Sequence, residues 1–255
     1  MTYYDGEDAC ALLEALKTHR KITSLSISNA VVSHTEREVH QITECINWIV
    51  KENDIQTLSI FNLQFAHLDL EWLVNLKSFS FLNCEAVLLE KVFESMYSIR
   101  NLEYLNLRRT IVGEAEGALG TLILNNKNLK TINISECRLK FTQELQNAFD
   151  HADLSVLNVC DNDQINFEGI IDKCSGLTHL SLGGKRTRLG KLNLKRLRYL
   201  FVTDCDIGEE DARVLCSIAD LPQNKNQELQ IKACDCNVEP EALIKLKAFF
   251  SVSLI

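Results

Sequence analysis

Apolar residues recur along this chain in a short spacing that is repeated nine times. The spacing has the form L-x-x-L-x-L-x-x-[N/C]-x-L and is clearest from Leu102 to Val112 and from Leu129 to Leu139. Two apolar residues separated by one position alternate with their neighbours as they do in a strand with one buried face. A unit repeated every 20 to 33 residues is typical of a solenoid, in which each unit packs on its neighbours.

Each repeat is termed a rung here, and the two residues of its central L-x-L are its ladder residues. The ladder residues are Leu25/Ile27, Leu58/Ile60, Phe79/Phe81, Leu105/Leu107, Ile132/Ile134, Leu157/Val159, Leu180/Leu182, Leu200/Val202 and Leu229/Ile231. The slot, three residues after the second ladder residue, holds Ala30, Leu63, Cys84, Thr110, Cys137, Asn162, Lys185, Cys205 and Cys234. We predict parallel strands with ladder residues inward and a buried slot, where Asn bonds to backbone and Cys fills the same space.

Segments between the rungs carry apolar residues at helical spacing. They are residues 36–50, 88–96, 166–174 and 210–219. Each predicts a helix that packs its apolar stripe on the back of the sheet. The seventh unit, from Leu177 to Arg196, is too short for a full helix and predicts a loop crossover. Its basic stretch from Lys185 to Arg198 is either a solvated face or a patch that docks an acidic partner.

The two ends of the chain carry helical patterns that suit caps. Residues 8–17 form an amphipathic pattern, either a cap or the helical half of a preceding repeat. Pro240 stands where a helix over residues 241–250 would begin, and the tail 251–255 predicts a last strand. We expect one domain over residues 1–255, with an N-terminal cap or half-repeat at 1–21, repeats at 22–238 and a C-terminal cap at 239–255.

These motifs resemble the leucine-rich repeat proteins, specifically the types with long, helix-bearing repeats. The segment from Ile207 to Leu215 resembles the ribonuclease-inhibitor subtype, and the segment from Asp172 to Leu180 resembles the cysteine-containing subtype found beside F-boxes. The resemblance covers roughly residues 10–250. It implies an α/β solenoid of about nine repeats, with a curved parallel β-sheet on the concave face and helices and loops on the convex face.

Composition narrows the classes of partner. The net charge of −8 and the pI near 5.3 argue against binding to nucleic acid or to an anionic membrane. The chain opens with polar and acidic residues rather than a signal peptide, so its ten cysteines are expected as free thiols in the cytoplasm. Cys234-x-Cys236 has no second Cys/His pair at metal-binding spacing, and we expect neither a metal nor a cofactor.

Outward residues beside the ladder residues form columns on the exposed face of a parallel stack. The middle column is small and polar until Phe201, but aromatic and basic side chains group in two places. The first group is Phe61, Leu82, Tyr104, Arg108 and Arg109, and the second is His179, Arg198, Tyr199 and Phe201. Aromatic residues and arginine are enriched at interaction hot spots, so we predict that both groups bind a protein partner.

Catalytic motifs are missing from the chain. It has no His-Glu-x-x-His, no Gly-x-Ser-x-Gly and no phosphate-binding loop, and Cys160 and His179 lack a visible third polar partner. We therefore expect a non-enzymatic, monomeric interaction module that acts as an adaptor, a substrate-recognition subunit or a sensor. The alternatives are the repeat domain of an innate-immune receptor, a eukaryote-like bacterial effector or, less favoured, an enzyme such as a ubiquitin ligase component.

Overall fold

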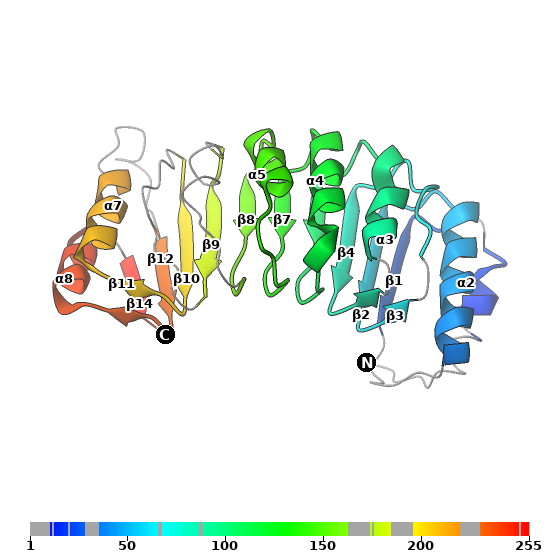
Figure 1. Ribbon diagram of the computed structural model, residues 1–255, viewed down its shortest axis with the longest axis horizontal. Coiled ribbons are helices and arrows are strands. Elements are labelled where there is room, and N and C mark those ends of the chain that lie inside the picture. Colours follow the sequence, from blue (N-terminus) through cyan, green and yellow to red (C-terminus); the bar gives the residue numbers. More distant parts are fainter. Residues whose placement is uncertain are drawn as a thin grey trace.

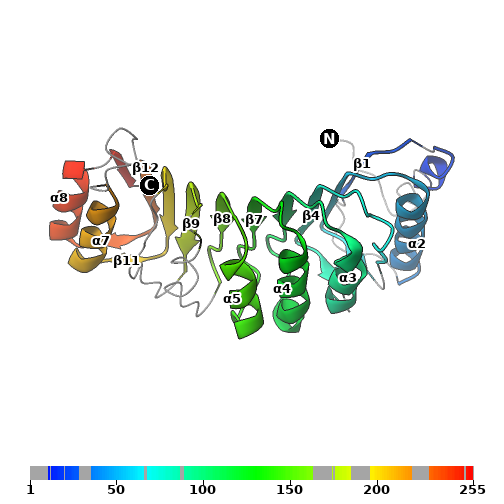
Figure 2. The same cartoon turned by 90° about the horizontal axis from the view of Figure 1, so that it is seen from above.

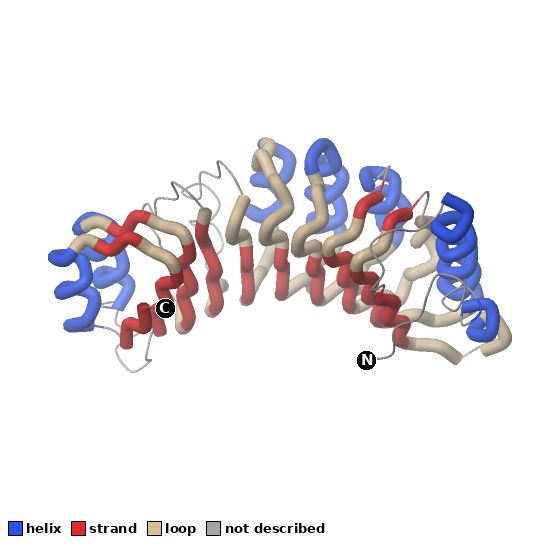
Figure 3. Tube along the Cα trace, turned by 90° about the horizontal axis from the view of Figure 1, so that it is seen from below, coloured by secondary structure: helices blue, strands red, loops and turns tan. Residues whose placement is uncertain are grey.

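A curved sheet of ten parallel strands runs the length of the molecule (Figure 1). In spatial order the strands are β1 (Ser24–Ser28), β2 (Thr57–Phe61), β4 (Ser78–Leu82), β6 (Tyr104–Asn106), β7 (Thr131–Asn133), β8 (Val156–Asn158), β9 (His179–Gly183), β10 (Tyr199–Thr203), β12 (Gln230–Cys234) and β14 (Ser251–Leu254). Figure 2 shows the strands on the inner side of the arc and the helices on its outer side, and Figure 3 shows the same two layers from below. The expected leucine-rich repeat solenoid is confirmed.

The computed structural model describes residues 11, 13–19, 21–28, 36–65, 68–86, 89–162, 174, 176–184, 196–219, 230–249 and 251–254. Residues 13–16 of the expected N-terminal helix are helical. The helix expected at 166–174 and the crossover of the seventh unit lie outside the described residues, apart from Cys174 and the ends of that unit. The slot residues Ala30 and Lys185 lie outside them as well.

Helices follow most strands and cover the outer face of the sheet. They are α2 (Glu36–Glu52), α3 (Leu89–Ser95), α4 (Glu116–Asn125), α5 (Gln143–Asp150), α7 (Glu209–Ala219) and α8 (Pro240–Phe249). The 3-10 turn η1 (Met96–Ser98) follows α3, and η2 (Gly113–Ala115) precedes α4. Two small two-stranded sheets are also present. One pairs β3 (Gln64–Phe65) with β5 (Glu85–Ala86), and the other pairs β11 (Asp206–Ile207) with β13 (Asn237–Val238). The helices expected at 36–50, 88–96, 210–219 and 241–250 are confirmed, with Pro240 as the first residue of α8.

Helices α4 and α5 are not among the helices predicted from the sequence. Helix α4 contains Gly117 and Gly120, which disfavour helix, and buries apolar or small residues on several sides. Helix α5 has eight residues, of which Leu145, Ala148 and Phe149 are buried. Gly120 lies against the backbone of α5, so the two helices pack closely. Tertiary packing therefore outweighs the weak local helix preference of α4, whereas the apolar residues of α5 stand at helical spacing.

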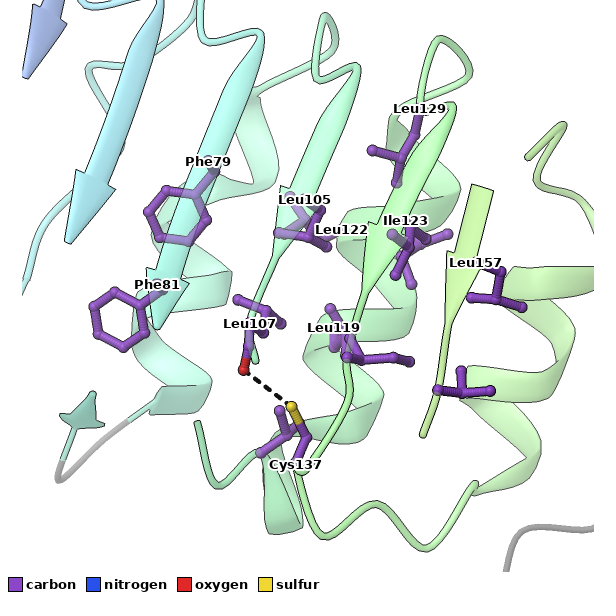
Figure 4. Close-up of a cluster of buried hydrophobic side chains, with 14 of the residues drawn as sticks. Phe79, Phe81, Leu105, Leu107, Leu119, Leu122, Ile123, Leu129, Cys137 and Leu157 are labelled. Carbon is purple, nitrogen blue, oxygen red and sulfur yellow. Dashed lines mark hydrogen bonds between the residues drawn. The ribbon is translucent and has the colours of Figure 1, made fainter. Parts of the chain in front are cut away.

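The ladder residues form the core between the sheet and the helices. From Leu58 to Val202 each ladder side chain is at most 1% exposed. Figure 4 shows Leu105 and Leu107 of one rung beside Phe79 and Phe81 of the preceding rung, with side chains of α4 behind them. Burial of each large apolar side chain contributes about 1.5–3 kcal/mol, so a regular ladder stabilises every rung through its neighbours.

In five of the described rungs the slot residue links the rung to the one before it. The Sγ atom of Cys137 donates to the carbonyl of Leu107 at 3.0 Å, the second ladder residue of the preceding rung (Figure 4). Cys84 donates in the same way to Ile60, Thr110 to Phe81 and Asn162 to Ile134. In the ninth rung the strand register makes Cys236 the slot residue, and it donates to Val202, whereas Cys205 of the eighth rung donates to Thr203 of its own rung. Burial raises the pKa of Cys84 to about 11 and that of Cys137 to about 12, so both thiols keep their donor proton at neutral pH.

In seven of the described rungs the strand also ends in the same turn, two residues after the second ladder residue. The residues there have positive φ between 50° and 61° and are Asn62, Asn83, Arg109, Glu136, Asp161, Asp204 and Asp235. In the seventh rung this position is Gly184. The N–H group of the turn residue donates to a carbonyl of the next rung, for example from Glu136 to Cys160 at 2.9 Å. Asn and Asp tolerate this left-handed conformation better than most residues, which explains most of the positions.

The predicted register of the ninth rung is wrong by two residues. Strand β10 pairs Leu200 with Ile231 and Val202 with Ala233, so the ladder residues are Ile231 and Ala233. The slot is therefore Cys236, and Cys234 is a half-buried outward residue rather than an inward one. Ala233 is too small to stand out in an apolar pattern, which is the reason for the error.

Candidate interaction surface

Outward residues of the strands form three columns across the concave face. The first column contains Tyr104, His179 and Tyr199, because Tyr199 pairs with His179 and Tyr104 occupies the same position in its strand. The middle column contains Asn106, Asn133 and Asn158, followed by Ser181, Phe201 and Lys232. The third column contains Phe61 and Leu82 in direct register. Neighbours within a column are about 4.8 Å apart along the sheet.

The first predicted group, termed the N-terminal patch, comprises Phe61, Leu82, Tyr104, Arg108 and Arg109. Phe61 and Leu82 are half-buried neighbours, and the N–H of Asn83 donates to the Arg108 carbonyl at 2.9 Å, so β2, β4 and the end of β6 adjoin here. Tyr104 lies four residues before Arg108, about 13 Å along the strand. Its hydroxyl accepts a hydrogen bond from the Asn106 amide at 3.0 Å. The fold thus groups Phe61, Leu82 and Arg108 but places Tyr104 at the other side of the sheet face.

Both arginines of the N-terminal patch are paired with Glu136 of the next rung. The Nη2 atom of Arg108 lies 2.9 Å from Oε1 of Glu136, and the Nε atom of Arg109 lies 2.7 Å from Oε2. Partial burial by itself would raise the pKa of Glu136, but hydrogen bonds and charge from Arg109 and Arg108 outweigh it and hold that pKa below its usual value. The carboxylate already uses part of the donor capacity of the arginines.

The second group, termed the C-terminal patch, comprises His179, Arg198, Tyr199 and Phe201 together with Lys232. The rings of His179 and Tyr199 are 5.9 Å apart at 34°, and Lys232 Nζ lies 6.0 Å from the centre of the Tyr199 ring. Phe201 lies between Ser181 and Lys232 in the register. Tyr199 and Phe201 are half-buried, whereas His179, Arg198 and Lys232 are exposed. Aromatic and basic groups therefore meet on three adjacent strands.

Lys232 is predicted from the sequence to lie in the third column, and it is not among the predicted partner-binding residues. The register of the ninth rung moves it to the middle column, beside Phe201. The turn residue indicates the correct register of the ninth rung, because Asp235 occupies the same position in its rung as Asp204 does in the preceding one. Glu136 is missed for a different reason, since an ion pair between rungs depends on side-chain directions that spacing does not reveal.

The considered Cys160–His179 pair does not form a nucleophile and base. Cys160 is 5% exposed, and burial raises its pKa to about 12, so the thiol is neutral. Cys160 lies in the third column and His179 in the first, and these two columns are about 13 Å apart along the strands.

Within the described ranges, no three His, Cys, Asp or Glu side chains gather as metal ligands would. None of the described helices has the length and apolar character to cross a membrane.

Comparison with known proteins supports the architecture. No family model and no curated protein sequence matches this chain. The structure of internalin C2 from Listeria monocytogenes aligns over 84% of this chain and 84% of that chain, with a TM-score of 0.54 and 17% identity. The internalin InlF from the same organism covers 98% of this chain and 94% of its own at 14% identity, with a TM-score of 0.35, too low to establish a common fold. The likeness to internalin C2, a leucine-rich repeat protein, concerns the fold.

Proposed function

We propose that this protein is a non-enzymatic interaction module that binds a protein partner on the concave face of its sheet. The observation that carries the proposal is the C-terminal patch, where exposed and half-buried aromatic and basic side chains from β9, β10 and β12 meet. Aromatic residues and arginine, such as Tyr199, Phe201 and Arg198 here, are enriched at protein interfaces. The parallel strands hold them on a rigid surface, which limits the entropy that binding would cost.

An adaptor, substrate-recognition or sensor role fits this surface. We propose the cysteine-containing repeat type for the rungs with a thiol in the slot, because the thiol there donates to the preceding rung. We also propose a reducing, cytoplasmic setting, since disulfide formation at these thiols would remove their hydrogen bonds. The protein is proposed to act as a monomer.

Two double variants test the proposal. The first variant, Tyr199→Ala with Phe201→Ala, removes the tyrosine and phenylalanine side chains of the C-terminal patch. The second, Tyr104→Ala with Arg108→Ala, removes one aromatic and one basic side chain of the N-terminal patch. Each is compared with wild type in affinity capture from cell lysate, followed by identification of the bound proteins. We expect the C-terminal double variant to lose a partner that wild type retains, while its melting temperature stays close to that of wild type. Unchanged partner recovery by both folded variants would refute the proposal.

A further inference from the structure

The two patches differ in the state of their basic groups. In the described part of the chain, ion pairs occupy Lys17, His40, Arg108, Arg109, Lys130, Arg213 and Lys245. Arg198 and Lys232 of the C-terminal patch have no carboxylate of the described residues within 4.0 Å. Within the described residues, the cations of the C-terminal patch thus have no carboxylate partner, whereas Glu136 pairs with both arginines of the N-terminal patch and offsets one of their two charges.

The concave face around the C-terminal patch carries no carboxylate among its described column positions. These positions on β8, β9, β10 and β12 are Val156, Asn158, Cys160, His179, Ser181, Gly183, Tyr199, Phe201, Thr203, Gln230, Lys232 and Cys234. Where the strands exit, Asp161, Asp204 and Asp235 stand in the turns. These column positions thus hold two aromatic rings and Lys232 with no carboxylate among them, while the aspartates stand at the edge of the surface.

Register places small residues on one side of Phe201 and a cation on the other. Ser181 of β9 pairs with Phe201 and Gly183 pairs with Thr203, so the β9 residue directly beside Phe201 is small, while His179 stands two residues away beside Tyr199. On the other side Lys232 pairs with Phe201, and its Nζ atom is near the Tyr199 ring. The backbone positions of Phe201 and Lys232 are one strand spacing apart, about 4.8 Å, so an apolar group that packs on Phe201 lies near an ammonium that can bind a carboxylate.

We infer that the C-terminal patch binds a short acidic segment of a partner protein, in which a carboxylate stands beside an aromatic or aliphatic side chain. The apolar side chain packs on Phe201, and the carboxylate accepts hydrogen bonds from Lys232 or Arg198. The inference rests on the proposed function and specifies the chemistry of its partner.

The net charge of the chain limits the length of this segment. At −8 the whole molecule repels an extended polyanion, but charges farther away than the screening length of roughly 8–10 Å have little influence at physiological salt. A short segment with one or two carboxylates meets mainly the local cations. This favours a peptide segment over a nucleic acid, whose charge extends over a much longer range.

The experiment selects ligands and then changes one charge at a time. A phage-displayed library of linear heptapeptides is selected on the full chain, and the best peptide is synthesised with its carboxylate and with the corresponding amide. Fluorescence anisotropy gives the Kd of both peptides for wild type, Lys232→Glu, Phe201→Ala and the matched control Lys247→Glu. Lys247 is an exposed cation of α8, so the control makes the same charge change outside the sheet.

We expect selection to enrich Asp or Glu beside an aromatic or aliphatic residue. Lys232→Glu should weaken binding of the acidic peptide by about tenfold, and Lys247→Glu should change it by less than about twofold. The amide peptide should bind wild type more weakly and should lose most of its sensitivity to Lys232→Glu. Phe201→Ala should weaken both peptides.

Three results would overturn the inference: no selected peptide, selected peptides without acidic enrichment, or equal effects of Lys232→Glu and Lys247→Glu. If the double variant at Tyr199 and Phe201 still loses a cellular partner in any of these cases, the concave-face function stands and only the acidic chemistry fails. If neither this variant nor the double variant at Tyr104 and Arg108 loses a partner, the proposed function itself fails.

Discussion

At the scale of single residues, the slot shows that one hydrogen bond can be made by three kinds of side chain. Asn162 donates to the Ile134 carbonyl at 2.7 Å and accepts the N–H groups of Cys137 and Leu139. Thr110 makes the corresponding bond with its hydroxyl at 2.6 Å. In these rungs the slot holds a small donor that reaches the preceding rung, whereas Leu63 fills the slot of the second rung with an apolar side chain. Thr110, which departs from the Asn/Cys pattern, fulfils the same requirement.

Thr110→Val and Thr110→Cys test this requirement. Valine has nearly the same shape as threonine but cannot donate to Phe81 or accept from the Cys84 N–H, so we expect a loss of about 1–3 kcal/mol in the free energy of unfolding. Cysteine keeps a donor, so Thr110→Cys should cost less than about 1 kcal/mol. Urea unfolding of both variants measures the difference, and equal midpoints would show that the hydrogen bond is unimportant.

Glu136 gives the stability of the protein a defined dependence on pH. Its folded-state pKa is held below the ordinary value of 4.5, so the unfolded chain takes up the proton at a higher pH than the folded chain does. The contribution of Glu136 is therefore present above about pH 4.5 and is lost as the pH falls through the lowered value.

Glu136→Gln removes that contribution and keeps the shape of the side chain. We expect wild type to be more stable than the variant at pH 7, and the difference between their urea midpoints to shrink when both are measured at pH 3. A difference that stays constant between the two pH values would contradict the role of the Arg108–Glu136–Arg109 pairing.

At the scale of elements, contacts between neighbouring repeats decide where helices form and how closely they pack. Helices α4 and α5 lie side by side, and a Cβ atom on Gly120 would lie 3.1 Å from the Glu144 carbonyl oxygen of α5. The missing side chain allows this approach, although glycine lowers the intrinsic helix preference of α4. Gly117 of the same helix is exposed and has nothing within 4 Å of its would-be Cβ atom.

These two glycines form a matched pair of tests. Gly117→Ala should stabilise the protein by about 0.5–1 kcal/mol, because alanine favours the helix and meets no neighbour. Gly120→Ala should destabilise it by about 1 kcal/mol, because α5 has to move away. Thermal or urea unfolding gives both values. Similar gains from both substitutions would show that α4 and α5 can separate without cost.

At the scale of the whole molecule, the solenoid is a linear chain of contacts between neighbouring rungs. Its cooperativity therefore depends on every interface between adjacent strands. The interface between β9 and β10 is especially sensitive, because a Cβ atom on Gly183 would lie 2.3 Å from the Thr203 carbonyl oxygen and 2.9 Å from the Thr203 nitrogen. These are backbone atoms of the neighbouring strand, and they cannot move without parting the sheet.

Gly183→Ala should weaken this interface by about 3 kcal/mol and uncouple the rungs on its two sides. Hydrogen exchange should then show β10, β12 and β14 opening at lower free energy than β4, β6 and β7. Gly117→Ala serves as the control and should leave the two halves coupled. A single cooperative transition with the wild-type midpoint would argue against a critical contact at Gly183.

The apolar spacing predicts the solenoid, the inward ladder and most helices because each requirement is local and repeated. A slip of one residue would bury polar side chains, so the register of eight rungs follows from the pattern. The ninth rung fails because Ala233 offers a weak apolar signal. The turn at Asp235 would have corrected it, since the left-handed backbone favours Asp and Asn there.

The candidate site depends on the tertiary structure to a greater extent. The sequence by itself determined which residues point outward and which aromatic and basic residues occur near one another in neighbouring rungs. Only the folded chain decided that Glu136 pairs with Arg108 and Arg109, and that Lys232 adjoins Phe201. The physical reason is that strand periodicity sets the direction of a side chain, whereas charge pairing depends on distances between rungs far apart in the sequence.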